Sequence, residues 1–287
     1  MTLAASRTIA DLSDTHAISG VLNSILAQEA GQDYGDYALV DRAGFAFGYP
    51  LSAVTGLSLE ADYEDASAVR VEASPAHGHY RPNPALGAGS HVVGRVAIAR
   101  NPEQLSPSPV ARRHLALTEG RIALEAGAGD TDYLRGTISG TVATPLGPGD
   151  LRLKALGGWG TRGLPAYRSF VLGGRGTLLG EPFRRFGGRS YGLARLEWEV
   201  PVPFVAIPLG SFVSTGSTMR LAPFVAVGWT DRALGGTPWR ESDGLRPVAG
   251  LAADLFMRLV RVEAGVGLRT GSVGVTVDFG PAWWGIL

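Results

Sequence analysis

The sequence predicts an all-β protein built as an antiparallel transmembrane β-barrel. Three observations support this class: apolar and polar residues alternate with a period of two, the alternating runs are long, and the composition is poor in charge and rich in glycine. The 287 residues include 41 glycines, 18 % charged residues and no cysteine. A soluble domain usually has about a quarter charged residues and about 7 % glycine. No stretch approaches the roughly 20 consecutive apolar residues of a membrane-spanning helix, so we expect any membrane crossing to use strands.

The clearest alternation lies between residues 193 and 202. Its apolar phase is formed by Ala194, Leu196, Trp198, Val200 and Val202. Its opposite phase contains Arg195, Glu197 and Glu199. Because strand side chains point alternately to the two faces of a sheet, this pattern fits lipid on one side and a wet lumen on the other. Between Leu117 and Ile122 the phase slips by one residue, which predicts a β-bulge.

Eleven such runs follow one another from residue 42 to the C-terminus. Their clean stretches have about 9–14 residues, the length that a tilted strand needs to cross a bilayer, whereas strands of globular proteins average 5–6 residues. A soluble sandwich is the alternative, but its strands would be shorter and its outer face more charged. The runs are 42–51, 54–73, 91–100, 114–126, 132–145, 150–160, 190–203, 218–230, 245–256, 258–269 and 272–281.

The connections alternate between short turns and long loops, as in outer-membrane barrels. The tight joins are Pro50–Ala53, Pro145–Gly149 and Phe256–Met257, and the long connections are 74–90, 161–189 and 231–244. Aromatic residues at the ends of the runs predict two girdles, with caps of a soluble core as the alternative. The long-loop girdle would contain Tyr63, Tyr133, Trp159 and Trp229, and the short-turn girdle Tyr49, Trp283 and Trp284.

The first 41 residues do not share the clear alternation. They lack the basic start, apolar stretch and small-residue cleavage site of a secretory signal. We therefore expect 1–41 to be a loop or the remnant of an earlier strand. Within it, 15–37 is either the end of a strand plus a loop or a short amphipathic helix. Residues 42–287 are predicted to form the barrel part of the chain.

Charge and motif content argue against several other functions. The 26 basic and 26 acidic residues give no overall attraction to nucleic acid. His77-Gly-His79 has no third metal ligand nearby in sequence, and Gly174-x-Gly176 is not surrounded by a βαβ unit. No nucleophile elbow, metalloprotease motif or P-loop occurs. We expect no catalytic residues, no metal, no cofactor and no nucleic-acid partner.

The segment 168–202 carries the most specific pattern in the chain. It reads Phe-Val-Leu-Gly-Gly-Arg-Gly-Thr-Leu-Leu-Gly over 170–180, followed by a Gly-Gly pair and a run that contains Leu196-Glu197 and Pro201. This pattern resembles the bacterial surface antigen barrel of the BamA/TamA superfamily of outer-membrane assembly and secretion proteins. The lumen-loop motif comprises Leu172, Gly173, Gly174, Thr177, Leu178, Leu179, Gly180, Gly187 and Gly188.

The resemblance implies a barrel of about sixteen strands in which the loop 161–189 lies in the lumen between the eleventh and twelfth strands. Six of the eleven runs precede the loop and five follow it. The chain is therefore expected to be the C-terminal part of such a barrel, a fragment whose N-terminal strands are missing. The resemblance also implies the bacterial outer membrane as location. Its partners would be outer-membrane lipid, client outer-membrane or secreted proteins, and periplasmic domains missing here.

Two departures from the family pattern concern an ion pair between the loop and the wall. The family's loop arginine is Leu179 here, its partner acid in the thirteenth strand is Ala226, and Glu181 replaces an aromatic residue. Losing both charges together is self-consistent, because one charge left alone where water is scarce is costly. The remaining loop arginines are expected either to pair with Glu197 or Glu199 or to solvate an extracellular loop; they are Arg175, Arg184, Arg185 and Arg189.

The function implied by the resemblance is insertion or translocation of proteins at the outer membrane, without bond-making chemistry. It would act at a weak seam between the first and last strands, whose C-terminal side here contains Val273, Val275, Val277 and Phe279. The alternatives are a passive pore or structural barrel, and a membrane anchor for an N-terminal enzyme domain absent from this chain. Charges on the lumen phase would either set ion selectivity or form salt-bridge ladders: Glu60, Asp62, Arg95, Arg121, Glu125, Arg135, Arg152, Lys154, Arg195, Glu197, Arg261 and Glu263.

Overall fold

One antiparallel sheet of 12 strands dominates the structure, in the order β1-β2-β3-β4-β5-β6-β7-β10-β11-β12-β13-β14. The computed structural model describes residues 1–12, 15, 18–70, 72–100, 117–208 and 216–279. The strands are β1 (Thr2–Asp11), β2 (Tyr37–Ser52), β3 (Thr55–Ala68), β4 (Gly89–Arg100), β5 (Leu117–Gly129), β6 (Tyr133–Leu146), β7 (Gly149–Gly160), β10 (Ser190–Pro203), β11 (Thr218–Thr230), β12 (Arg246–Leu255), β13 (Val260–Gly267) and β14 (Val273–Phe279). The all-β, antiparallel class predicted from the sequence is confirmed.

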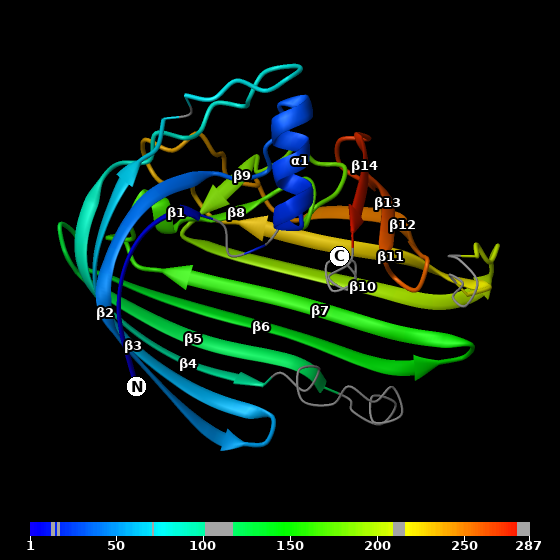
Figure 1. Ribbon diagram of the computed structural model, residues 1–287, viewed down its shortest axis with the longest axis horizontal. Coiled ribbons are helices and arrows are strands. Elements are labelled where there is room, and N and C mark those ends of the chain that lie inside the picture. Colours follow the sequence, from blue (N-terminus) through cyan, green and yellow to red (C-terminus); the bar gives the residue numbers. More distant parts are fainter. Residues whose placement is uncertain (13–14, 16–17, 71, 101–116, 209–215, 280–287) are drawn as a thin grey trace.

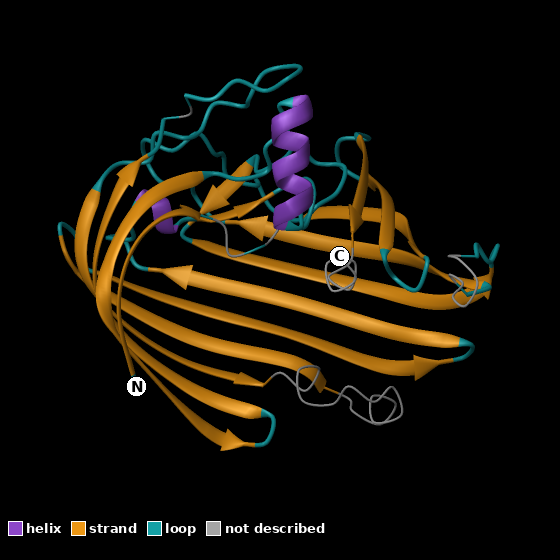
Figure 2. Cartoon of the chain, in the orientation of Figure 1, coloured by secondary structure: helices purple, strands orange, loops and turns teal. Residues whose placement is uncertain are grey.

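The sheet is strongly curved, and a second, two-stranded sheet lies on its concave side (Figure 1). That small sheet pairs β8 (Phe170–Leu172) with β9 (Phe186–Gly188), both within the loop 161–189. Helix α1 (Gly20–Ala30) and the connections β3–β4, β7–β10 and β11–β12 lie toward one end of the strands, and the short turns β2–β3, β6–β7 and β12–β13 lie at the opposite end (Figure 2). Among the described residues, β1 and β14 are the two margins of the sheet and do not pair with each other.

All eleven runs predicted from the alternation are strands of this sheet, and β1 adds a twelfth. Residues 1–41 thus hold a full strand, a helix and the start of β2, and the helix is one of the two structures expected for 15–37. Strand β1 pairs with β2 from Thr2↔Ala46 to Asp11↔Tyr37. Arg7 interrupts the phase that contains Leu3 and Ile9, and for this reason the hydrophobic pattern does not reveal β1.

The predicted change of phase in β5 is confirmed, since the pairing with β6 shifts register between Leu117 and Glu119. The excess of glycine also has a physical cause in this sheet. A Cβ added to Gly136 would meet the Trp159 ring, and one added to Gly192 would meet the Trp229 ring. At each of these two positions, the glycine therefore leaves room for the indole ring of the tryptophan paired with it on the neighbouring strand.

The two faces of the sheet differ in chemistry, as the alternation predicts. Large apolar side chains are exposed on the convex, outer face of nearly every strand: Phe45, Phe47, Tyr49, Leu59, Tyr63, Val92, Ile98, Ile122, Leu124, Leu134, Ile138, Leu153, Trp159, Trp198, Val225, Trp229, Leu251, Val273 and Val275. Charged side chains and the loop 161–189 occupy the concave, inner face. An ion pair on the outer face, between Arg7 and Asp41, joins β1 to β2.

The aromatic residues expected at the long-loop end do not all point outward. Tyr63, Trp159 and Trp229 are exposed on the outer face, whereas Tyr133 is buried on the inner face. The Tyr133 hydroxyl donates a hydrogen bond to Glu125 at 2.8 Å, so this residue belongs to the inner polar network rather than to a girdle. Tyr49 is exposed at the short-turn end. Trp283 and Trp284 lie outside the described residues. No helix among the described residues has the length and apolar character needed to cross a membrane.

Candidate functional site: the loop on the inner face

The loop 161–189 is a compact unit whose glycines allow sharp turns. Gly173, Gly174 and Gly180 have φ angles of 123°, 69° and 104°, a region that side chains with a Cβ rarely adopt. The Gly173 N–H donates to the Thr177 hydroxyl at 2.9 Å, and the Arg184 N–H donates to the Gly173 carbonyl at 3.0 Å. These bonds fold the predicted motif back on itself. The family-like glycines are therefore explained by the backbone of the loop.

The remaining motif glycines permit close contacts with neighbouring segments. A Cβ on Gly180 would approach Gly267 N to 2.5 Å, at the turn between β13 and β14. A Cβ on Gly187 would meet the Trp239 ring, and one on Gly188 would meet Asp231. Gly180 thus lets the tip of the loop touch the C-terminal strands, and the Gly187-Gly188 pair fits against the connection between β11 and β12.

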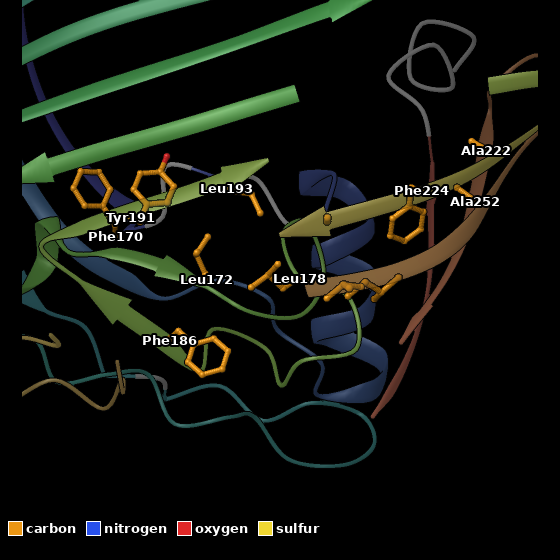
Figure 3. Close-up of a cluster of buried hydrophobic side chains, with 12 residues drawn as sticks. Phe170, Leu172, Leu178, Phe186, Tyr191, Leu193, Ala222, Phe224 and Ala252 are labelled. Atoms are coloured by element: carbon orange, nitrogen blue, oxygen red, sulfur yellow. The ribbon is translucent and has the colours of Figure 1, made fainter. Parts of the chain in front are cut away.

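Apolar side chains of the loop dock on strands β10, β11 and β12 (Figure 3). Leu178 is 0 % exposed, and Phe170 stacks on Tyr191 with ring centroids 4.6 Å apart. Each large apolar side chain buried in this way contributes about 1.5–3 kcal/mol. The full cluster consists of Phe170, Leu172, Leu178, Leu179, Phe186, Tyr191, Leu193, Ala222, Phe224, Ala226, Val248 and Ala252.

Leu179 and Ala226, the two positions for which the sequence resemblance implies a lost ion pair, belong to the same buried cluster. The Leu179 side chain lies against Gly265 of β13 and Gly274 of β14, where there is no Cβ to exclude it. Ala226 pairs directly with Arg195 across β10 and β11. Glu181 is also buried, close to Gly267. Leu179 and Ala226 are therefore held by apolar packing.

A second attachment uses Arg168, at the end of the 3₁₀ turn η3 (Ala166–Arg168). Its guanidinium lies 2.5 Å from Glu64 on β3 and 3.3 Å from Glu125 on β5. Burial by itself would lower the pKa of Arg168, but the two carboxylates outweigh it and raise the pKa above its ordinary value. Arg168 therefore stays charged and ties the loop to the N-terminal half of the wall.

Tyr167, next in sequence, adds a contact with β4 in the same region. Its hydroxyl lies 3.1 Å from Nδ1 of His91, and the Nε2 atom of that imidazole lies 3.3 Å from the Thr131 hydroxyl. Both Tyr167 and His91 are buried. Burial raises the pKa of Tyr167 to about 12. The loop is thus held to β3, β4 and β5 by polar contacts.

The charged residues of the inner face pair with one another along the wall. Arg95 contacts Asp62 at 2.6 Å and Glu125 at 2.7 Å, and it also contacts Glu64. Arg195 contacts Glu197 at 2.6 Å and Glu263 at 2.9 Å. These pairs form the salt-bridge ladders that were one of the two expected arrangements. Arg121 and Lys154 have no ion-pair partner within the described part of the chain.

Glu197 and Glu199 were expected as partners of the loop arginines, and the structure places other arginines beside them. Glu197 pairs with Arg195 and Arg261, and Glu199 pairs with Arg152 at 3.2 Å and with Arg220 and Arg258. All of these arginines lie on the strands or on the turn between β12 and β13. Arg152 and Arg220 lie on β7 and β11, the two neighbours of β10. Arg258 and Arg261 instead reach across the inner face from the β12–β13 turn and from β13, which does not pair with β10.

The loop arginines make different contacts. Arg184 pairs with Asp11 at 2.8 Å and with Asp36 at 2.9 Å. Arg175 lies 3.4 Å from Asp278 on β14. Arg185 is exposed, as expected for a residue that solvates the loop. The sequence did not indicate Asp11, Asp36 or Asp278 as partners, because their proximity depends on how the whole sheet curves.

The predicted seam strand, β14, pairs with β13 through Val260↔Phe279 to Val266↔Val273. Its odd-numbered residues, Val273, Val275, Val277 and Phe279, share the outer face, and Val273 and Val275 are 72 % and 65 % exposed. Its inner face carries Thr276 and Asp278. A cavity of about 260 Å³ lies between this inner face, the loop and the wall, and it is lined by Lys154, Arg175, Thr177, Glu197, Thr276 and Asp278 among others.

Sequence reasoning missed several residues of the site, above all Glu64, His91, Tyr167 and Arg168. Glu64 continues the inner phase of Glu60 and Asp62, so the alternation itself contained that signal. Arg168 and Tyr167 lie in a loop without periodicity, and no pattern marks them. The described residues contain no group of three or more His, Cys, Asp or Glu side chains arranged to hold a metal ion. His77, expected as a chance loop residue, contacts the Glu29 carbonyl at 3.3 Å.

Comparison with known proteins supports the fold and not a sequence family. No family model and no curated protein matches the sequence. The structure is similar to the crystal structure of BamA from Haemophilus ducreyi lacking POTRA domains 1–3, with a TM-score of 0.61 and 13 % sequence identity. The similarity covers 96 % of this chain, and the chain spans 57 % of the length of that structure. The fold is therefore that of a BamA-like β-barrel.

Proposed function

We propose that this protein is an outer-membrane β-barrel that takes part in insertion or translocation of other proteins at the bacterial outer membrane. The observation that carries the proposal is the fold similarity to the BamA structure over 96 % of the chain. The loop motif supports it independently, since the resemblance noted in the sequence belongs to the same superfamily. No bond-making chemistry and no cofactor form part of this proposal.

The outer face supports the membrane location. Exposed leucine, isoleucine, valine and aromatic side chains cover it from β2 to β14. Burying one such side chain is worth about 1.5–3 kcal/mol, so a face with this many of them would be strongly unfavourable in water. Trp159 and Trp229, near the long-loop ends of their strands, are suited to the boundary between lipid and water. The outer membrane is the location that strands of this length and pattern favour.

The margin at β14 supports the assembly role. Its outer residues are exposed and apolar, and β13 is the one strand that pairs with it among the described residues. An extended segment of a client protein could pair its backbone N–H and C=O groups with those that a sheet margin presents. We therefore infer that client outer-membrane or secreted proteins approach at β14. Periplasmic domains outside this chain would deliver them.

A structural, loop-filled barrel is the second candidate, and one specific observation favours it. Leu179 and Ala226 replace the family's ion pair, and the loop is held by buried apolar contacts instead. A permanently docked loop would suit a barrel that only occupies the membrane or forms a narrow pore. The remaining alternative, an anchor for an enzyme domain, depends on a domain outside this chain.

The experiment that tests the proposal compares vesicles with and without the protein. The protein is reconstituted into lipid vesicles, a urea-denatured outer-membrane barrel is added as client, and client folding is followed by its heat-modifiable gel mobility. We expect the protein to accelerate folding of the client over that in empty vesicles. A matched sample containing an unrelated small outer-membrane barrel controls for bilayer defects.

The outcomes separate the candidates. Faster client folding with the protein than with the control barrel supports the assembly function. Equal client folding with release of a trapped small solute points to a passive pore. Equal folding without release points to a structural barrel. Recovery of the protein in the soluble fraction of cells would overturn the membrane location itself.

A further inference from the structure

Two arginines of the loop 161–189 reach opposite margins of the sheet. Arg184 pairs with Asp11, the last residue of β1, at 2.8 Å and with Asp36, just before β2, at 2.9 Å. Arg175 pairs with Asp278 of β14 at 3.4 Å and donates a hydrogen bond to the main-chain carbonyl of Val277. Through Arg175 and Arg184, one loop thus contacts both the N-terminal and the C-terminal strands.

Aromatic side chains connect the two arginines. The Arg175 guanidinium lies 5.2 Å from the centroid of the Tyr34 ring, and that of Arg184 lies 5.1 Å from the Phe183 ring. Tyr34 and Phe183 meet edge to face with centroids 5.2 Å apart. Cation–π and edge-to-face contacts are both favourable at these distances. The contacts therefore run without a break from β14 to β1.

Helix α1 and the segment before it join the same arrangement. The side-chain carbonyl of Asn23 accepts a hydrogen bond from the Tyr34 N–H at 2.9 Å. The Ser19 N–H, at the start of α1, lies 3.5 Å from Asp278. These contacts hold Tyr34 in place and bring the N-terminal segment against β14. The position of β14 thus depends on residues far from it in sequence.

Both arginines of these ion pairs are buried, so the loss of a partner is costlier than it is for a pair on the protein surface. Arg184 is 5 % exposed and Arg175 is 8 % exposed. Burial by itself would lower the pKa of Arg184, but the hydrogen bond to Asp11 and the charges of Asp11 and Asp36 raise it above its ordinary value. Removing one partner of a buried pair leaves the other charge without compensation. Neither arginine is therefore replaceable by a neutral residue without loosening its contacts.

We propose that Arg175 and Arg184, joined through Tyr34 and Phe183, form a clasp by which the loop holds β14 at a fixed place relative to β1. The clasp engages a main-chain carbonyl of β14 and so competes with any strand that would pair with that strand. Opening of the clasp is then the step that frees β14. The part of this inference that concerns client strands rests on the proposed function, whereas the clasp itself does not.

Hydrogen exchange of the protein in lipid nanodiscs, without any client, tests the clasp. In Arg175→Met we expect the amides of β14 to exchange about tenfold faster, because a buried pair and a hydrogen bond to β14 are lost. Arg184→Met should have the same effect on β14, although it touches β1. The double variant should be no faster than either single variant, because the two contacts act in series.

Arg152→Met is the matched control, because Arg152 also pairs with a buried glutamate on the inner face but joins neighbouring strands β7 and β10. We expect it to leave exchange in β14 unchanged. Unchanged exchange of β14 in Arg175→Met, or an equal increase in Arg152→Met, would overturn the clasp. Exchange in β10–β12 reports whether a variant is still folded.

Asp278→Asn is the second variant, for the case in which Arg175→Met does not fold. It removes the ion pair from the side of β14 while leaving the buried arginine in place, so we expect faster exchange in β14 with a smaller increase. No increase there would also contradict the proposal. Because these measurements use no client, a failure of the clasp is distinct from a failure in the client-folding experiment.

Discussion

Over β10–β12 the loop 161–189 rests on a buried apolar cluster, whereas over β3–β5 it is held by buried charges and hydroxyl groups. Leu178 and Phe170 belong to the first contact, and Arg168 and Tyr167 to the second. The two regions lie on the same inner face and hold one loop. The loop is therefore held against the inner face by two kinds of interaction.

The apolar region is expected to stabilise the docked loop and the charged region to orient it. Apolar burial contributes roughly in proportion to the area removed from water. A buried ion pair gains Coulomb energy but loses hydration of both groups, so its net contribution is small while its geometry is demanding. The apolar region is thus expected to supply most of the stability, and the charged region to fix how the loop is oriented.

Among the variants that test these two regions, Leu178→Ala should cause the largest loss of stability of the docked loop. Leu178 is 0 % exposed, and removing most of a fully buried leucine side chain costs about 2–5 kcal/mol. We expect the loop to detach from β10–β12 before the sheet unfolds. Limited proteolysis of the purified protein, followed by mass spectrometry, would show new cleavage within 161–189. Leu196→Ala, on the outer face of β10, is the control and should leave the loop protected.

Arg168→Met should have the second largest effect. Breaking a buried ion pair from one side costs about 3–5 kcal/mol, but Glu64 and Glu125 keep Arg95 as a partner, so we expect about 2 kcal/mol. Denaturant unfolding measures the loss. The effect should be nearly independent of salt because the pair is buried.

Arg7→Met provides the contrast for Arg168→Met. Arg7 is 70 % exposed and lies 3.5 Å from Asp41 on the outer face, and exposed pairs of this kind contribute about 0–1 kcal/mol. A loss of stability as large in Arg7→Met as in Arg168→Met would contradict the distinction between buried and exposed pairs.

The hydrophobic alternation sufficed to predict the sheet because outward-facing and inward-facing residues alternate along the strands. It predicted eleven strands, the bulge in β5 and the inward phase of Arg195 and Glu197. It failed at β1, where Arg7 faces outward and only Leu3 and Ile9 mark the phase. It also misplaced Tyr133, because a tyrosine near a strand end fits a girdle and an inner hydrogen bond equally well.

The site was harder to predict because its contacts join distant parts of the chain. The loop motif could be recognised from its glycines. Gly173, Gly174 and Gly180 meet a local backbone demand, and the Gly187-Gly188 pair permits close contacts with another segment. The partners of Arg168, Arg175 and Arg184 depend on curvature of the sheet and on where α1 lies. The sequence does not show which carboxylates the curvature brings close to these arginines. Glu197 and Glu199 are near the loop in sequence, whereas Asp11 and Asp278 are its partners in space.

Loss of the Tyr167 hydroxyl proton, which occurs at high pH, should have the smallest effect on the free energy of unfolding. Burial raises the pKa of Tyr167 to about 12, from an ordinary value of 10.0. The unfolded chain therefore loses this proton first as the pH rises, so the stability that the neutral hydroxyl contributes is complete below about pH 10 and is lost between about pH 10 and 12.

Tyr167→Phe has no proton to lose at this position, so its stability should fall less than that of the wild type across the same interval. The measurement is the difference between wild-type and variant free energies of unfolding from pH 9 to 12, which cancels the other groups that titrate there. Tyr63→Phe, on the outer face, serves as control. A constant difference between wild type and Tyr167→Phe would mean that Tyr167 is not held in a dry contact with His91, and that the polar attachment over β3–β5 is open to water.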